Sequence, residues 1–203
     1  MRQRPSFRGS PGRLRRPIFG AVGLRRAAAQ HSEAEGLLLR HFAAHSLLTV
    51  EIGVAEGGSA WEAAQVMPSD GELHLIDPYF RATTSMVCPA QITARRLVRS
   101  VARGKVHWIR QFSHGARAGW TSPIDLLFID GDHSYEGIRR DWDDWTPLVR
   151  EGGHVALHDA HPDAEWTRPE HGPVRLLAEV QRDGWRLVDH VDSLTVLRRE
   201  DDD

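Results

Sequence analysis

Short apolar runs alternate along the chain with segments that repeat apolar residues at helical spacing. The strings LLTVEIGV, ELHLID, KVHWIR, IDLLFID and GHVALHD are apolar and end at glycine or polar residues, which is typical of buried strands. The strings SEAEGLLLRHFAAH, SAWEAAQVM, AQITARRLVRSVAR, SYEGIRRDWDDWTPLV and GPVRLLAEVQRD place apolar residues every three or four positions, which predicts helices. Two more predicted strands, WRLVDHV and LTVLRR, close the chain.

This alternation predicts an α/β protein with a doubly wound, Rossmann-like, mostly parallel sheet and helices on both faces. The last two strands are separated only by Asp192 and Ser193, so they must run antiparallel to each other. The segment DWDDWTP is polar apart from Trp142 and Trp145, and we interpret it as a surface helix on which these two rings pack together.

Size and composition indicate one soluble globular domain. The chain has 203 residues, of which 40% are hydrophobic and 27% are charged. No stretch approaches the roughly 20 apolar residues of a membrane span, so we expect no membrane partner. The single cysteine, Cys88, excludes an internal disulfide and favours a cytoplasmic location.

Charge is distributed unevenly between the two ends of the chain. Residues 1–30 contain eight arginines and no acid, whereas the remainder contains 18 basic and 28 acidic residues. We therefore expect residues 1–30 to be a basic, flexible arm and residues 31–203 to be the folded domain. The acidic domain argues against a nucleic-acid partner. The arm has the composition of an organelle transit peptide, or could join a neighbouring subunit in a homo-oligomer.

Ligands of an open parallel sheet bind at the carboxyl ends of its strands, and polar residues follow each predicted strand here. Gly53 and Gly57, in VEIGVAEGGSAW, allow a tight turn and a close approach to a ligand. Glu51 and Glu56 suit a ligand that carries positive charge. Asp77, about twenty residues further on, is placed to hydrogen-bond a ribose diol. A nucleoside across the first two strand ends is the hypothesis, and a plain strand-to-helix turn is its alternative.

A second group of polar residues follows the fourth and fifth strands. Asp130 ends the fourth strand, and His158 and Asp159 end the fifth. Because neighbouring strands lie about 5 Å apart, we expect these three side chains to converge. Two carboxylates and an imidazole suit a divalent ion such as Mg²⁺, Mn²⁺ or Fe²⁺. His133 could act as a general base, or it could simply be hydrogen-bonded into a turn.

The segment at residues 160–172 is long, polar and aromatic, and loops of this kind are often functional. We interpret it as a substrate lid that uses His161, Trp166 or His171. Specificity would come from this lid, from the loop at residues 78–89 and from the arm.

The strings FIDGDHSYEG and GGHVALHD resemble class I S-adenosylmethionine-dependent methyltransferases, in the branch of small-molecule O-methyltransferases. The similarity covers residues 47–198. It implies a methyltransferase domain with a seven-stranded sheet of order 3-2-1-4-5-7-6 and an antiparallel seventh strand. It also implies S-adenosylmethionine as cofactor, bound by Glu51, Gly53, Glu56, Gly57, Ser59, Asp77, Pro78, Phe112, Ser113 and Asp130.

The resemblance also indicates the chemistry. Metal-dependent relatives carry an acid after strand four and a pair of acids after strand five, which fall on Asp130 and on His158 with Asp159. His158, at the first position of that pair, departs from the pattern because it is not an acid. Two mechanisms therefore stay open: Mg²⁺ or another divalent metal on these three residues, or proton removal by His133 or His158. The expected catalytic residues are Asp130, His133 and His158. The expected acceptor is a hydroxyl of a small molecule, such as a sugar or a phenolic secondary metabolite.

Two other functions remain as alternatives. A metal-dependent hydrolase could use Asp130, Asp132, His158 and Asp159, although it would leave the glycine loop unexplained. A catalytically inactive partner subunit with the same fold is the third hypothesis, because few residues precede the predicted sheet.

Overall fold

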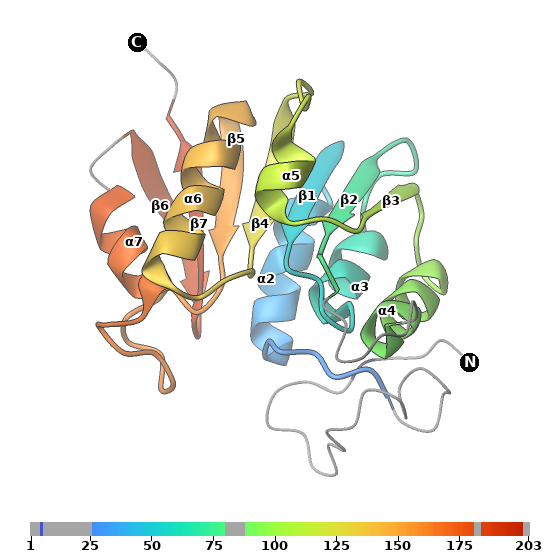
Figure 1. Cartoon of the computed structure of the whole chain (residues 1–203), viewed down its shortest axis with the longest axis horizontal. Coiled ribbons are helices and arrows are strands. Elements are labelled where there is room, and N and C mark those ends of the chain that lie inside the picture. The colour runs from blue at the N-terminus through green and yellow to red at the C-terminus, as the bar shows by residue number, and fades with distance from the viewer. Residues whose placement is uncertain (1–4, 6–25, 80–87, 181–183, 201–203) are drawn as a thin grey trace.

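The computed structural model describes residue 5 and residues 26–79, 88–180 and 184–200, which form one sheet with helices on both sides (Figure 1). The strand order is β3-β2-β1-β4-β5-β7-β6. β7 runs antiparallel to β5 and β6, and the other pairs are parallel. The predicted order is thereby confirmed. The strands are β1 (Leu48–Ile52), β2 (Glu72–Ile76), β3 (Lys105–Ile109), β4 (Ile124–Ile129), β5 (Val149–Leu157), β6 (Trp185–Val191) and β7 (Leu194–Arg199).

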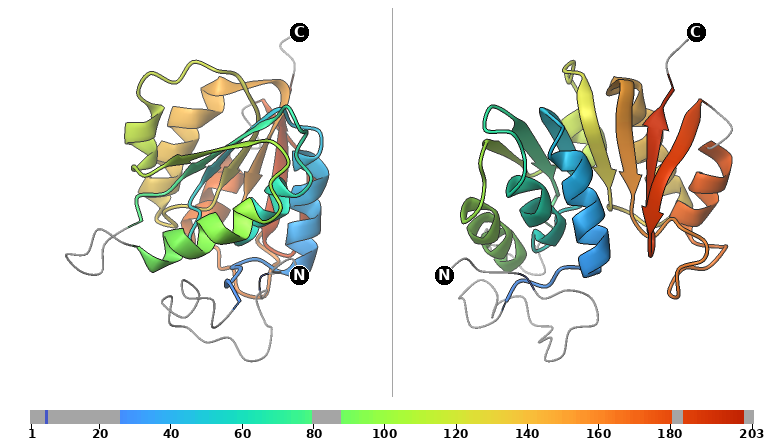
Figure 2. Two further views of the ribbon diagram at one scale, coloured as in Figure 1. Left: turned by 90° about the vertical axis from the view of Figure 1, so that its right-hand side faces the viewer. Right: turned by 180° about the vertical axis from the view of Figure 1, so that it is seen from behind.

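The helices form two layers, one on each face of the sheet (Figure 2). One layer contains α2 (Glu33–Ala43), α3 (Gly58–Ala64) and α4 (Pro89–Arg99). The other contains α5 (Ser113–Arg117), α6 (Tyr135–Trp145) and α7 (Gly172–Val180), and a short 3₁₀ turn at Thr146–Leu148 follows α6. Each layer encloses its own apolar core because successive side chains of a strand point to opposite faces. None of the described helices is long and apolar enough to cross a membrane.

Three local predictions were wrong. α5 was not predicted, because a helix of five residues is too short to show helical periodicity. β5 begins at Val149, so part of the segment predicted to end a helix is strand. In DWDDWTP, Asp143 and Pro147 are exposed, but Trp142 and Trp145 are only 5% and 0% exposed and pack edge-on against Trp185 and Trp120 instead of against each other.

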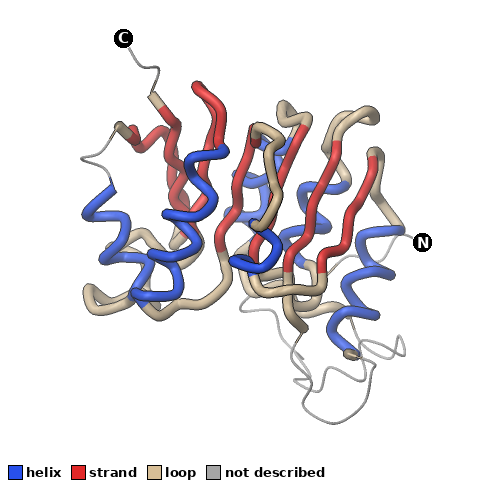
Figure 3. The backbone as a smooth tube through the Cα atoms, turned by 45° about the horizontal axis from the view of Figure 1, so that its top comes forward, coloured by secondary structure: helices blue, strands red, loops and turns tan. Residues whose placement is uncertain are grey.

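The loops that follow the parallel strands gather at one edge of the sheet, the lower edge in Figure 3. Residues 26–31 reach the same edge, where Ala27, Ala29 and His31 are buried. This N-terminal segment packs closely against α3, because a Cβ added at Gly58 would lie 2.7 Å from the Cα of Ala29. Of the predicted arm, residues 1–4 and 6–25 lie outside the described residues, whereas its last residues pack on the domain.

Candidate active site

The loop between β1 and α3 depends on glycine at two positions. Gly53 has a φ of +87°, and a Cβ there would lie 2.0 Å from the carbonyl oxygen of Asp130. Gly57 has a φ of +80°, and its Cβ would lie 2.9 Å from that of Ala94. Residues with a side chain rarely adopt such angles, so Gly53 lets the loop lie against the end of β4 and Gly57 lets it lie against α4.

Asp77, which follows β2, holds this loop in place. Its Oδ2 accepts hydrogen bonds of 2.9 Å from the backbone N–H groups of Val54 and Ala55. Its Oδ1 accepts a 2.7 Å bond from the N–H of Tyr79. Asp77 also lines the cavity beside the loop. Its predicted hydrogen bonding to a ribose diol stays a prediction.

Two cavities meet at this edge of the sheet. The first, of about 400 Å³, is lined by Ser59, Asp77, Asp130 and His133, and by Ala28, Gln30 and His31 from the N-terminal segment. The second, of about 450 Å³, is lined by Phe112, Ser113, Arg140 and Asp141. Both include Gly53, Pro78 and Gly131, so together they form a bent groove across the end of β1.

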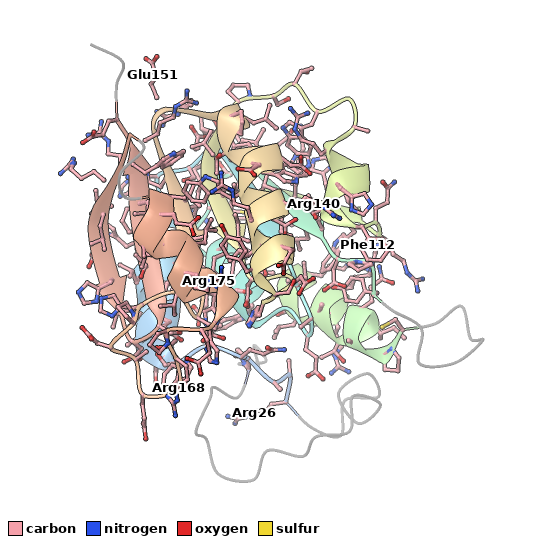
Figure 4. All side chains as sticks on the ribbon, turned by 60° about the vertical axis from the view of Figure 1, so that its left-hand side comes forward. Arg26, Phe112, Arg140, Glu151, Arg168 and Arg175 are labelled. Atoms are coloured by element: carbon pink, nitrogen blue, oxygen red, sulfur yellow. The ribbon has the colours of Figure 1, made fainter. Side chains whose placement is uncertain are left out.

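The second cavity lies between the loop after β3 and helix α6. Phe112 and Arg140 approach it from these two segments, and Figure 4 shows them on the same side of the molecule. The Ser113 hydroxyl donates a hydrogen bond to the buried carboxylate of Asp141, which ties the two walls together. Arg168 of the β5–α7 loop lies at the carboxyl edge in the same figure, and Glu151 lies at the opposite end.

Two acids that the resemblance assigns to the cofactor do not line either cavity. Glu51 is 1% exposed and lies behind Ser59, whose hydroxyl donates a 2.6 Å hydrogen bond to it. Burial raises the pKa of Glu51 to about 8, so this carboxyl is protonated at neutral pH. Glu56 accepts a 2.8 Å hydrogen bond from the N–H of Ala28 and thereby anchors the N-terminal segment.

The ends of β4 and β5 carry a charged cluster, defined as Glu35, Asp130, His133, His158 and Asp159. Its centre is His158, whose side chain is 1% exposed. The Nδ1 of His158 lies 3.2 Å from Asp130 Oδ1 and 3.5 Å from Asp159 Oδ2. The Nε2 lies 3.5 Å from Glu35 Oε2. The structure thus brings together the three side chains that were expected to converge, and it adds Glu35.

Charge pairing sets the protonation states in this cluster. Burial alone would lower the pKa of His158, but attraction to Asp130, Asp159 and Glu35 raises it well above its ordinary value. Burial alone would raise the pKa of Asp130, yet attraction to His158 and hydrogen bonding with His133 hold it at about 2. Glu35 likewise has a pKa of about 2, because its contacts with His158 outweigh its burial. His158 is therefore an imidazolium enclosed by carboxylates.

His133 and Asp130 are the members of the charged cluster that line the first cavity, and His133 is the more exposed of the two. Its side chain is 45% exposed, and its Nε2 lies 3.1 Å from Asp130 Oδ1. The Nδ1 lies 3.7 Å from Asp159 Oδ2, beyond hydrogen-bond distance. The hydrogen bond to Asp130 raises the pKa of His133.

Glu35 was missed by the sequence analysis. It occupies the third position of α2, where it accepts a 2.7 Å bond from the N–H of Ser32 in a capping box. Its Oε1 also accepts bonds of 2.9 and 2.6 Å from the N–H and hydroxyl of Ser193. The string SEAE signals the capping box, but no sequence signal indicates that the same carboxylate reaches β5 and β7.

The residues predicted for the lid are placed differently from one another. The Trp166 indole N–H donates a 2.8 Å hydrogen bond to Asp159 Oδ1, next to the charged cluster. His161 stacks on His190, with ring centroids 3.9 Å apart, beside a separate cavity of about 330 Å³. His171 accepts a bond from the N–H of Arg168 within a local turn. Most of the loop at residues 78–89 lies outside the described residues.

Comparisons with known proteins agree with this geometry. A family model described as a methyltransferase domain matches residues 50–160. The O-methyltransferase TomG of Streptomyces achromogenes, involved in tomaymycin synthesis and solved with SAM, has a TM-score of 0.64 and 19% identity, covering 91% of this chain and 88% of that one. An O-methyltransferase of Bacillus cereus in complex with SAH has a TM-score of 0.62 and 16% identity, covering 91% and 87%. At these identities the likeness shows the fold alone.

Among curated proteins, the uncharacterized protein R132 of Acanthamoeba polyphaga mimivirus is 35% identical over 60 residues. This match spans 29% of the chain and 26% of the viral protein. It therefore carries no argument about activity.

Proposed function

The chain belongs to the family of methyltransferase domains, and we propose that it transfers the methyl group of S-adenosylmethionine to a hydroxyl oxygen of a small molecule. The observation that carries the proposal is the pairing of His133 with Asp130 at the wall of the first cavity, which residues of the glycine loop also line. Structural neighbours of the same fold that were solved with SAM or SAH support the choice of cofactor.

The bent groove suits this cofactor in shape and in chemistry. Its two cavities, of about 400 and 450 Å³, are in the size range of small-molecule sites. Gly53 lets the backbone approach a ligand closely, and Asp77 offers carboxylate oxygens at the position expected for a ribose diol. Phe112 provides an aromatic surface for the nucleobase of the cofactor in the second cavity. When bound, S-adenosylmethionine supplies a methyl group on a positively charged sulfur.

His133 is suited to remove the proton of the acceptor hydroxyl. When its Nε2–H donates to Asp130, the Nδ1 lone pair is left to accept a proton. The Asp130 carboxylate then stabilises the imidazolium that forms, as the aspartate of a Ser-His-Asp triad does in hydrolases. The acceptor oxygen forms its bond to the methyl carbon, and the electrons of the carbon–sulfur bond go to sulfur. His158 is enclosed by carboxylates on both ring nitrogens, so the geometry favours His133 as the base.

The residues expected to hold a metal do not fit one. A bound ion requires that all of its donor atoms lie close to one another. The Nδ1 of His158 lies 3.2 Å from Asp130 Oδ1 and 3.5 Å from Asp159 Oδ2, but among the described residues these three do not form a group whose donor atoms all lie within 4.8 Å of one another. This donor set supports a reaction without a metal at Asp130, His158 and Asp159. The hydrolase alternative needs a metal at the same residues and loses support for the same reason.

The proposal is tested on the full chain in two steps. Titration calorimetry should show binding of S-adenosylhomocysteine, and labelled S-adenosylmethionine should then methylate one or more members of a panel of phenols and sugars. The His133→Ala variant should lose about 10²- to 10⁴-fold in kcat, the usual contribution of a general base, and should still bind S-adenosylhomocysteine.

The matched control is His45→Ala, since His45 is exposed, lines neither cavity and should leave kcat unchanged. Absence of S-adenosylhomocysteine binding by the folded wild type would overturn the proposal. Full kcat in His133→Ala would overturn the assignment of the base.

A further inference from the structure

Three potential metal ligands meet on the sheet away from the candidate active site. Glu72 and His74 are two positions apart on β2, so their side chains share one face. His107 on β3 is the register partner of His74, and the two imidazole rings stack with centroids 4.3 Å apart. The Nε2 atoms of His74 and His107 each lie 3.3 Å from Glu72 Oε2. We name these residues the edge triad.

The edge triad is separate from the residues of the proposed reaction. Glu72 is the first residue of β2, whereas Asp77, at the candidate active site, follows the last. β3 is the edge strand of the sheet, at the end opposite β6 (Figure 1). The side chains are 14% exposed at His74, 34% at Glu72 and 43% at His107, whereas the Nε2 atom of His107 is itself buried and has no hydrogen-bond partner. Trp120 packs edge-on against His74 at 4.7 Å and covers the inner side.

Neighbouring charges prepare the triad to donate electron pairs. Lys105 Nζ lies 3.2 Å from Glu72 Oε1, which leaves Oε2 directed at the two imidazoles. A carboxylate and neutral imidazole are the forms that bind metals.

We propose that Glu72, His74 and His107 bind a divalent transition-metal ion, with Zn²⁺ as the favoured occupant. Zinc–ligand bonds of about 2.0 to 2.2 Å in a tetrahedron place neighbouring donor atoms about 3.3 to 3.6 Å apart. Each imidazole nitrogen already lies 3.3 Å from the carboxylate oxygen, and all three donors lie within 4.8 Å of one another. Two imidazoles and one carboxylate favour zinc over magnesium or calcium, which prefer oxygen ligands.

The ion would join the edge strand β3 to β2 and would leave a fourth coordination position for water. β3 leads directly into Phe112 and Ser113, which line the second cavity. Bound metal should therefore stabilise this wall of the groove. The inference does not depend on methyl transfer, because metal binding and stability are measured without substrate.

The test uses the full chain after treatment with EDTA and dialysis. Calorimetry with ZnCl₂ should show one equivalent bound, and Zn²⁺ at about 100 times the dissociation constant should raise Tm by roughly 5 to 10 °C. Glu72→Gln and His107→Ala should each lower the affinity at least tenfold and abolish most of the shift. Both positions are solvent-accessible, so the metal-free variants should melt close to the metal-free wild type.

Two matched controls address competing sites. His190→Ala removes an exposed histidine whose ring stacks on that of His161 with centroids 3.9 Å apart, a rival pair, and should bind Zn²⁺ like the wild type. Asp130→Asn alters the charged cluster and should do the same. The proposal is overturned if the wild type binds no more tightly than Glu72→Gln, or if affinity is lost in either control instead of in His107→Ala.

Discussion

Two neighbouring parts of the same sheet edge are built in different ways. At the ends of β1 and β2 the structure relies on backbone, with Gly53 and Gly57 in the left-handed region and Asp77 holding the loop by accepting two N–H bonds from it. At the ends of β4 and β5 it relies on ionised side chains, with His158 enclosed by Glu35, Asp130 and Asp159. One part provides shape, and the other provides charge.

The two parts should be disrupted by different kinds of substitution. A backbone loop without space for a side chain is disrupted by a single added methyl group, whatever its charge. A buried set of charges tolerates changes of shape better, but removal of one member leaves the others uncompensated in a poorly solvated place. Variants of the two parts should therefore respond differently to volume and to pH.

The largest loss of stability should follow removal of the imidazolium. His158→Ala leaves the carboxylates of Glu35, Asp130 and Asp159 without their shared counter-charge, and we expect the free energy of unfolding to fall by about 3 to 5 kcal/mol. Urea unfolding of the variant and the wild type at pH 7 measures this difference in the free energy of unfolding. The exposed His171→Ala should change the same quantity by less than about 0.5 kcal/mol, and equal losses in the two variants would contradict the charge argument.

The shape of the first part is tested by a matched pair of glycines. Gly53→Ala places a Cβ 2.0 Å from a backbone oxygen at a φ of +87° and should cost about 3 kcal/mol or more. Gly119→Ala has a similar φ of +78° but no atom within 4 Å, so it should cost only about 1 to 2 kcal/mol of backbone strain. If urea unfolding shows equal losses, steric contact with β4 is not what requires Gly53.

The acid limb of the stability curve should report on Glu35. Its pKa is about 2 in the folded chain against an ordinary 4.5, so its contribution is complete above pH 4.5 and is lost as the pH falls toward 2. We expect Glu35 to contribute a loss on the order of 2 kcal/mol over this range, in addition to the loss from Asp130, and Glu35→Gln should lack only the part from Glu35. The exposed Glu136→Gln should retain the wild-type limb, and a limb unchanged in Glu35→Gln would argue against the pairing with His158.

The smallest effect, and the opposite in sign, is expected at Glu51. The folded chain keeps this carboxyl protonated up to a pKa of about 8, while the unfolded chain ionises it near 4.5, so the wild type loses stability as the pH rises through this window. Glu51→Gln cannot ionise and should be more stable than wild type at pH 7 by about 1 kcal/mol. The two proteins should be equally stable near pH 4. A destabilised variant at pH 7 would show that Glu51 is ionised there.

Most of the fold could be predicted from the sequence because its signals are local. The apolar periodicity of a strand or helix, its glycines and its caps are all read within about ten residues of sequence. LTVLRR, for example, occupies the predicted residues of β7. The chain order of strands and helices then restricts the topology, since parallel strands need crossover helices. The convergence of Asp130, His158 and Asp159 followed from the same rule, because adjacent strand ends are neighbours in any sheet of this order.

The remaining features depend on contacts between distant parts of the chain. Glu35 lies 158 residues from its partner Ser193, and Ala28 lies 28 residues from Glu56. Trp142 and Trp145 stand in a polar string, but the packing of α6 on the sheet buries them. No local pattern encodes such pairs, since each side chain alone fits a surface position equally well. Local sequence patterns predict which strand ends carry polar residues, whereas the pairing of those charges depends on the folded chain, because burial and contacts are set by elements that meet only after folding.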